Sequence, residues 1–190
     1  VRPVGASDSQ AVAPARPSQF YWLWAPTNFD TFCLHFDVNE DELGRRWHEE
    51  AVHVPVGGEA EARIGDYSIS WRPGTRRAAS FGLRLTDVDG GLTTVEYEPL
   101  FAFQMLGIGY GHPEWSHGVW KGETAVGGDR WSLPVADQAA PHHVHIQEVC
   151  RAVATLPDGT VHHGSGIVEQ LAFGDHRPSG LRGLFDGFAG

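Results

Sequence analysis

Short segments that alternate apolar and polar residues, separated by tight turns, run along most of this chain of 190 residues. In residues 31–37 the apolar and polar positions alternate strictly, which is the period of a strand with one buried face. Asp-Gly-Gly at 89–91 and Pro-Asp-Gly at 157–159 are typical of tight turns between strands. Helical periodicity is nearly absent. The sequence therefore predicts an all-β fold, either an antiparallel barrel or a sandwich.

The expected strands follow one another from residue 20 onward. They cover residues 20–24, 31–37, 45–54, 61–64, 67–72, 80–87, 92–97, 119–126, 129–133, 143–156 and 160–173. Residues 25–28 are predicted to form a turn, and residues 99–106 and 180–190 are the places for a short helix or turn. Residues 1–19, rich in Pro, Ala and Ser, are predicted to be a tail or linker before one barrel domain over residues 20–185.

The charge balance argues against a nucleic-acid partner. The chain has 14 Lys+Arg against 24 Asp+Glu, a formal net charge of -10 and no basic run, whereas phosphate-backbone binding needs clustered cations. No apolar stretch approaches the roughly 20 residues that span a bilayer, and the start lacks a signal peptide's apolar core, so we expect a soluble, cytoplasmic protein. Cys33 and Cys150 lie in predicted strands and suit reduced, buried thiols better than a disulfide.

The glycine-rich segment Gly109–Trp120 carries the densest chemistry of the sequence. It supplies four candidate catalytic residues, Tyr110, His112, Glu114 and His117. An imidazole beside a carboxylate can move a proton at neutral pH, and a phenol can donate a hydrogen bond to a carbonyl or hydroxyl group. Four indoles, from Trp22, Trp24, Trp115 and Trp120, are candidates to shape the pocket and to stabilise a carbocation. The alternative is that these aromatic residues only plug a barrel end.

A second group of histidines lies around residues 142–145. His143 and His145 share one face of a predicted strand, and two imidazoles two residues apart can present the ligands of a metal in a cupin-like enzyme. The alternative is a surface or hydrogen-bonding role. Strand pairing also argues against a larger metal site that includes His162 and His163. A simple hairpin places these two residues near the turn and His143 and His145 at the other end. The sequence therefore predicts no metal ion and no cofactor.

The early strands offer a third group, His35, Asp37, Trp47 and His48, as candidate ligand-binding residues. His35 and Asp37 share the strand face opposite Phe32, Leu34 and Phe36. If the aromatic face packs outward against a partner, the polar residues line a pocket. If the aromatic face is the core, they have a structural role, which is the usual outcome for polar residues on a half-buried strand.

Two other types of site find no support in the sequence. It has no Gly-x-Ser-x-Gly elbow for a nucleophile, and Gly164-Ser165-Gly166 is too short to count as one. It also has no Gly-rich loop followed by a helix that would bind a nucleotide phosphate.

Several segments resemble an uncharacterised bacterial family related to the carotenoid hydratases (hydroxyneurosporene synthase-like) and to AttH-like proteins. These segments are Tyr21–Asp30, Cys33–Asp37, Gly44–Glu49, Gly109–Trp115 and His176–Gly180. The resemblance implies a lipocalin-like β-barrel. In those relatives two barrels are joined and water is added to a double bond of an apolar polyene, whereas this chain has about one barrel's length. The resemblance therefore also implies a homodimer or a second barrel domain as partner.

Taken together, the residues and the resemblance predict a protein that binds a small, largely apolar ligand such as a terpenoid, steroid or polyketide-like molecule. The expected chemistry is that of a hydratase, isomerase or lyase working by acid–base catalysis. The alternatives are a non-catalytic carrier or structural module and a cupin-like metalloenzyme that uses His143 and His145.

Overall fold

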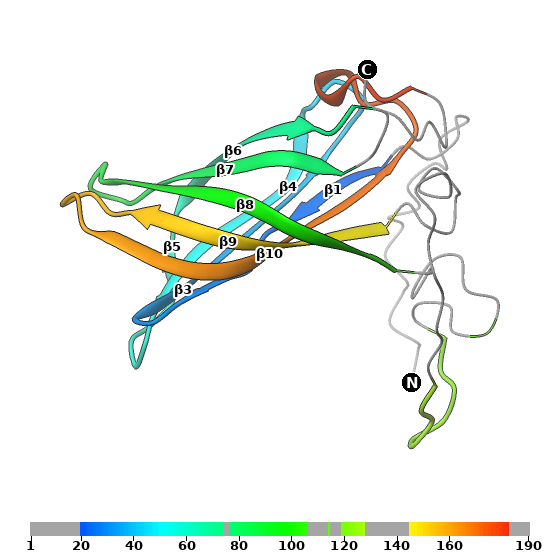
Figure 1. Ribbon diagram of the computed structural model, residues 1–190, viewed down its shortest axis with the longest axis horizontal. Helices are drawn as coiled ribbons and strands as arrows, with labels where there is room; N and C mark the ends of the chain where they lie inside the picture. Colours follow the sequence, from blue (N-terminus) through cyan, green and yellow to red (C-terminus); the bar gives the residue numbers. More distant parts are fainter. Residues whose placement is uncertain (1–19, 74–76, 106–113, 115–118, 128–144, 183–190) are drawn as a thin grey trace, which may run out of the picture.

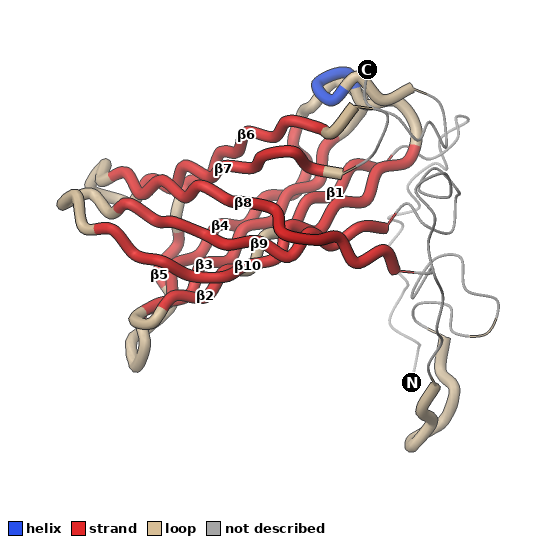
Figure 2. Tube along the Cα trace, in the orientation of Figure 1, coloured by secondary structure: helices blue, strands red, loops and turns tan. Residues whose placement is uncertain are grey.

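The computed structural model describes residues 20–73, 77–105, 114, 119–127 and 145–182 (Figure 1). Its ten strands are β1 (Phe20–Trp24), β2 (Thr27–Phe29), β3 (Phe32–Glu40), β4 (Arg46–Pro55), β5 (Glu61–Ala62), β6 (Ile64–Trp71), β7 (Ala78–Thr86), β8 (Leu92–Met105), β9 (His145–Thr155) and β10 (Val161–Phe173). The helical element among the described residues is one 3₁₀ turn, η3 (Arg177–Ser179), drawn in blue in Figure 2. The prediction of a nearly all-β, antiparallel fold is confirmed.

All ten strands belong to one antiparallel sheet, in the order β5-β4-β3-β1-β10-β9-β8-β7-β6, with β2 paired to β3 and β10. The sheet is strongly curved, so that β6 and β7 lie across from β1 and β4 (Figure 1). The β7–β8 and β9–β10 turns lie together at one end of the sheet, and η3 lies at the other (Figure 1). Gly90 and Gly159 adopt φ of 85° and 86° in those two turns, in the region that glycine enters most easily. The turns predicted from Asp-Gly and Pro-Asp-Gly are therefore confirmed.

The curvature brings β4 and β6 together, although the two strands do not form a ladder with each other. The Arg63 amide, just before β6, donates to the Ala51 carbonyl at 2.8 Å. Arg46 Nη1 of β4 donates to the Gly65 carbonyl at 2.8 Å, and the Gly65 amide donates to Glu49 Oε1 at 3.3 Å. We refer to these contacts as the β4–β6 seam. β6 is the last strand of the sheet, so one of its edges has no neighbouring strand to pair with. Side chains of β4 form hydrogen bonds with backbone groups on that edge.

The first hairpin differs from the prediction. Residues 25–28 do not form a turn: β1 and β2 both lie between β3 and β10, interrupted at Pro26, and the chain reverses at Asp30 and Thr31. The predicted turn is therefore wrong. Pro26 has no amide hydrogen to donate, but its carbonyl still accepts from the Ile167 amide at 3.1 Å. The Ala-Pro pair interrupts the strand without reversing it.

Two further predictions are corrected. Residues 99–106 were expected to hold a short helix or turn, but β8 continues through them to Met105 and pairs with β9, with a register shift between Pro99 and Phe101. The bulge accommodates a proline that cannot donate to the ladder. Residues 119–126 were expected to be a strand, but they form turn and irregular structure. The predicted strand at 129–133 and the predicted tail at 1–19 lie outside the described residues.

The hydrophobic core fills the concave side of the sheet. The alternating residues Phe32, Leu34 and Phe36 are at most 3% exposed, and the rings of Phe81 and Tyr97 pack 5.1 Å apart on the facing strands. The sequence left open which face of β3 is inside, and the structure assigns the aromatic face to the core. The rest of this core is Tyr21, Leu23, Ala25, Phe29, Val38, Ala51, Leu83, Leu85, Val95, Cys150, Ala152, Ala154, Val168, Ala172 and Leu181.

Cys33 and Cys150 are both unbridged; Cys150 is buried, as predicted, whereas Cys33 is only partly buried. Within the described part of the chain, no helix has the length and apolar character that a membrane crossing needs.

Candidate functional site

A pocket of about 290 Å³ lies on the concave side of the sheet, at the end that carries η3. Tyr21, Tyr67 and Ile69 give it an apolar wall. The polar groups that line it are Glu40, Arg46, His176 and Ser179. The pocket therefore combines a small apolar surface with a compact set of ionisable and hydrogen-bonding side chains, and such polar groups can orient a ligand.

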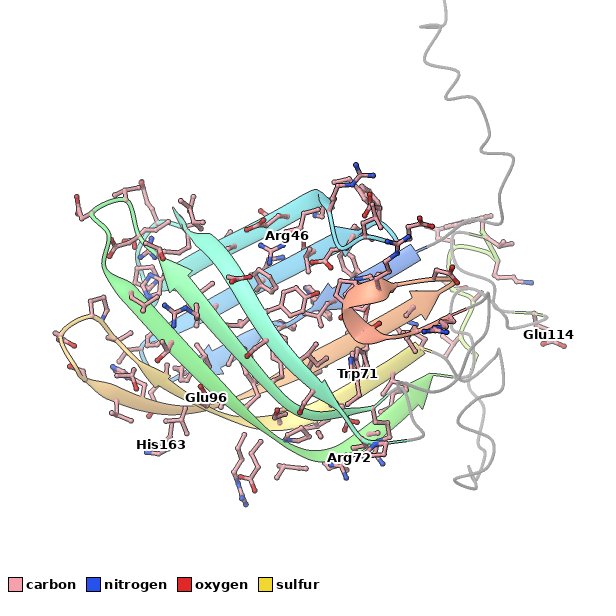
Figure 3. All side chains as sticks on the ribbon, turned by 90° about the horizontal axis from the view of Figure 1, so that it is seen from above. Arg46, Trp71, Arg72, Glu96, Glu114 and His163 are labelled. Carbon is pink, nitrogen blue, oxygen red and sulfur yellow. The ribbon has the colours of Figure 1, made fainter. Side chains whose placement is uncertain are left out.

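A β-bulge directs Arg46 into this pocket. In the β3–β4 ladder Asn39 pairs with His48, but the next residue, Glu40, pairs with Arg46, so Trp47 is the extra residue. Because side chains alternate between faces, the extra residue moves Arg46 to the concave face that Glu40 shares. Trp47 is left 63% exposed. Figure 3 shows Arg46 in the interval between β4 and β6.

Three side chains form a hydrogen-bonded chain at the pocket. Glu40 Oε2 lies 3.0 Å from His176 Nε2, and His176 Nδ1 lies 2.8 Å from Ser179 Oγ. Glu40 and His176 are 4% and 1% exposed, and the Tyr21 ring stacks on the imidazole with the centroids 3.7 Å apart. The order carboxylate, imidazole, hydroxyl is the order of a proton relay.

The relay has two self-consistent proton arrangements. The Glu40 carboxylate accepts the Nε2 hydrogen, so in the neutral ring Nδ1 accepts the hydroxyl hydrogen of Ser179. In the cationic ring Nδ1 donates to Ser179, whose hydroxyl then donates to the His176 carbonyl at 3.1 Å. The two arrangements differ by one proton on His176 and by the direction of the Ser179 hydroxyl hydrogen, and neither requires a change of backbone.

The turn that carries the relay is fixed on both sides. The His176 amide donates to the Leu181 carbonyl at 3.0 Å, and the Arg177 amide donates to the Glu42 carbonyl at 2.9 Å. Gly44 packs so closely on η3 that a Cβ atom there would lie 2.6 Å from Pro178 Cγ. The β3–β4 turn and η3 thus hold His176 against Glu40 of a distant strand.

Two phenols complete the pocket wall. Burial raises the pKa of both Tyr21 and Tyr67 well above the usual value, so both hydroxyls stay protonated and act as donors. Among the described residues, the Tyr21 hydroxyl has no hydrogen-bond partner in good geometry, although the neighbouring Tyr67 contributes to its raised pKa. A polar atom of a bound ligand can therefore accept a hydrogen bond from the Tyr21 hydroxyl.

Arg46 holds the negative charges around the pocket. Its guanidinium lies 3.4 Å from Glu40, 2.9 Å from Glu49 and 2.7 Å from Asp66. Glu40 is therefore paired with a permanent cation as well as with His176.

Five of the predicted ligand-binding residues come together, but on the convex face of the sheet. His35 Nε2 and His48 Nε2 lie 2.8 Å and 2.7 Å from the two oxygens of Asp37. Trp24 Nε1 donates to His35 Nδ1 at 3.4 Å, and Trp22 stacks on His48 with ring centroids 6.4 Å apart. This group, which we call the outer cluster, faces away from the apolar core and from the pocket.

The outer cluster continues toward β9 and β10. Trp22 Nε1 donates to Glu169 Oε1 at 2.9 Å, and His145 Nε2 lies 3.1 Å from the same oxygen. Burial alone would raise the pKa of Glu169, but hydrogen bonds from His145, Gln147 and Trp22 outweigh it and hold that pKa below its usual value. The β9–β10 pairing leaves His145 at the far end of the ladder from His162 and His163, as the hairpin argument predicted.

The remaining predicted residues are not brought to either group. Glu114 is exposed and lies beyond the end of the sheet (Figure 3), and Trp120 is 78% exposed. The predicted site residues Tyr110, His112, Trp115, His117 and His143 lie outside the described part of the chain.

Sequence reasoning missed every polar residue of the pocket. Glu40 follows the alternation of Phe36 and Val38, so its place on the concave face was available as a signal. Residues 176–180 were noted for the family resemblance, without a role. The approach of His176 to Glu40 spans 136 positions of sequence, and no local pattern encodes it.

The fold and the pocket together define a class: a strongly curved, antiparallel β-sheet protein with a polar pocket at one end of its core. The chain belongs to a family of unknown function, DUF8625, whose model matches residues 1–182. Neither the comparison with curated proteins nor the comparison with solved structures gives a match.

Proposed function

We propose that this protein binds a small, largely apolar molecule by a polar group in the Tyr21–Ser179 pocket and performs acid–base chemistry on it, as a hydratase or isomerase. The observation that carries the proposal is the Glu40–His176–Ser179 relay, with distances of 3.0 Å and 2.8 Å, at a pocket of about 290 Å³. A relay of this kind supplies and removes protons at neutral pH. This assigns the predicted chemistry to residues other than those of the 109–120 segment.

Each group of the pocket has a part in the proposed reaction. The Tyr21 and Tyr67 hydroxyls, held protonated by burial, donate to an oxygen of the ligand. In a hydration, one carbon of the double bond receives a proton from the relay and the other receives the oxygen of water, whose released proton returns to Ser179 and His176. Glu40 stabilises the His176 imidazolium, which donates the proton at the start and is restored when water releases its own proton. An isomerisation uses the same two proton transfers without the addition of water.

The pocket size limits the ligand. Small-molecule sites commonly measure about 300–1,000 Å³, so a pocket of about 290 Å³ holds a small molecule or one end of a longer one. The aromatic core fills the neighbouring space on the concave side. The β4–β6 seam supports a lipocalin-like barrel as the finer description of the fold. A small terpenoid is the ligand class that fits best.

The experiment is incubation of the full chain with geraniol or farnesol in deuterium oxide, followed by mass spectrometry of the recovered alcohol. We expect carbon-bound deuterium to appear with the protein, and to fall by about 100-fold or more in the Ser179→Ala and His176→Gln variants. Ser70→Ala is the matched control, because the Ser70 hydroxyl bonds to Ser80 on the exposed side of the sheet, away from the pocket. Isothermal titration of the same alcohols shows whether the pocket binds at all.

Binding without deuterium incorporation would replace the enzyme by the alternative, a hydrophobic-ligand carrier. Absence of both would overturn the proposal for these terpenoid alcohols. The resemblance to carotenoid hydratases, pairing with a second copy or a second barrel, and a cytoplasmic location stay predictions. Exposed Leu100 and Phe101 on β8 are apolar surface that such pairing would cover.

A further inference from the structure

We propose that the outer cluster contains a binding site for a divalent transition-metal ion, with His35, Asp37 and Glu50 as ligands and His48 as the residue that orients Asp37. The site lies on the opposite face of the sheet from the pocket and shares no residue with it. One potential ligand atom from each of the three residues lies within 4.8 Å of the others.

The separations are close to those of a bound ion. Imidazole nitrogen and carboxylate oxygen bind zinc at about 2.0–2.2 Å, so two ligands of one ion lie at most about 4.4 Å apart. His35 Nε2 is 2.8 Å from Asp37 Oδ2 and 3.9 Å from Glu50 Oε2. Small side-chain rotations are enough to bring these three atoms around one ion.

The strands hold the ligands in place. His35 and Asp37 are two residues apart on β3 and so project from the same face, and Glu50 of β4 lies directly opposite Asp37 in the ladder. Asp37 is only 8% exposed at its side chain, whereas His35 and Glu50 are 35% and 57% exposed. The ion would therefore have one fixed ligand at the sheet and open positions toward solvent.

The charge balance favours a cation here. Asp37 and Glu50 carry two negative charges, and within the described residues their ion-pair partners are imidazoles, with no Lys or Arg among them. Among the described residues, the two other fully buried carboxylates are each paired with arginine: Glu40 with Arg46 at 3.4 Å and Glu148 with Arg77 at 2.8 Å. A divalent ion would neutralise the charges that no arginine reaches.

His48 contacts the proposed ligand Asp37 and is not itself a ligand. Its Nε2 lies 2.7 Å from Asp37 Oδ1, the oxygen that faces away from His35. A hydrogen bond of this kind fixes a ligating carboxylate, and losing one commonly weakens metal binding about 10–100-fold. One imidazole with two carboxylates and open positions suits Zn²⁺, Mn²⁺ or Fe²⁺.

Metal binding requires a change of tautomer at His35. The contact from Trp24 Nε1 to Nδ1 places the ring hydrogen on Nε2, which donates to Asp37. To bind the ion through Nε2, the ring must carry its hydrogen on Nδ1, and the long 3.4 Å contact from Trp24 is then lost. Trp24 therefore favours the metal-free form, and its removal should not weaken metal binding.

The test is titration of the full chain, first treated with a chelator, with ZnCl₂ in a calorimeter, and with CoCl₂ followed by visible absorption. We expect one ion per chain. The variants His35→Gln and Asp37→Asn should each weaken binding by at least about 100-fold, and His48→Gln by about 10–100-fold. Trp24→Phe should bind as tightly as the unchanged protein, or more tightly.

His53→Gln is the matched control. His53 lies on β4, like His48, but it pairs with Glu61 of β5 outside the cluster, so this variant should bind the metal ion as tightly as the unchanged protein. Circular dichroism verifies that each variant is folded. If Asp37→Asn does not fold, His35→Gln and Glu50→Gln carry the test, since both side chains are more exposed. Absence of stoichiometric binding, or equal binding by His35→Gln and the unchanged protein, would overturn the proposal.

Discussion

Glu40 and Asp37 are almost equally buried on the same strand, yet they have different partners. Glu40 faces the concave side, where it meets the guanidinium of Arg46 and the imidazole of His176. Asp37 faces the convex side, where both partners are imidazoles. Arginine keeps its charge at any ordinary pH, whereas histidine changes charge near neutrality. Glu40 therefore keeps one permanent countercharge, Arg46, whatever the proton state of His176, whereas the countercharge of Asp37 depends on protons or a metal.

The largest expected effect comes from removing the permanent cation of the pocket. Arg46→Met leaves Glu40 with His176 alone and also breaks the β4–β6 seam, so we expect a loss of about 3–5 kcal/mol in the free energy of unfolding. Urea denaturation measures it. Arg45→Met is the control, because the Arg45 side chain is 77% exposed and its ion-pair partner among the described residues is Asp41, so the change should cost about 0–1 kcal/mol. Equal losses of unfolding free energy in the two variants would show that Arg46 contributes no more to stability than the exposed Arg45.

The next effect tests the close approach of strands at the seam. A Cβ atom at Gly65 would lie 2.6 Å from the Phe36 ring and 3.0 Å from Ala51 Cβ, so Gly65→Ala should cost about 1–3 kcal/mol by overpacking. Thermal or urea unfolding measures the change. Gly82→Ala should cost less, since its nearest contact, the Ser68 hydroxyl at 3.0 Å, can rotate away.

A smaller, pH-dependent effect is expected at the β10 end of the outer cluster. The pKa of Glu169 is lower in the folded protein than in the unfolded chain, so its contribution to stability is complete above the unfolded pKa of about 4.3 and is lost as the pH falls through the folded value. Glu169→Gln should therefore reduce the steepness of acid unfolding, as measured by urea denaturation across the acid range. An unchanged pH profile would show that Glu169 titrates normally.

The smallest perturbation compares the two faces without changing stability. Cys150 lies in the core, 1% exposed, and burial raises its pKa to about 12, whereas Cys33 lies on the convex face and is only partly buried. A thiol reagent should label Cys33 in the native protein and Cys150 only after unfolding. The Cys33→Ser variant shows which thiol reacts. Rapid labelling of that variant would contradict the assignment of faces.

The alternation of apolar residues was sufficient to predict most strands, because the side-chain period of two is a local property. It predicted β3, β9 and β10 to within a few residues, since each has one clearly apolar face. It failed where pairing overrides local preference. Residues 99–105 contain a proline and still extend β8, because β9 offers a partner along their whole length.

For the outer cluster, the sequence identified the residues but not the face of the sheet on which they lie. His35 and Asp37 were recognised as neighbours on one side of a strand, and Trp22, Trp24 and His48 were chosen for their chemistry. Only the register of β1, β3 and β4 shows that they meet, and only the curvature of the sheet shows that they meet outside the core.

The sequence by itself determined that this chain is an antiparallel β protein and which face of each strand is apolar. The tertiary structure decided where the chemistry lies. A one-residue bulge at Trp47 turns Arg46 inward, and the curvature of the sheet brings η3 and His176 onto Glu40. Both features depend on strand pairing between residues distant in sequence. The free energy of such pairing depends on both strands together, so it cannot be inferred from either segment by itself.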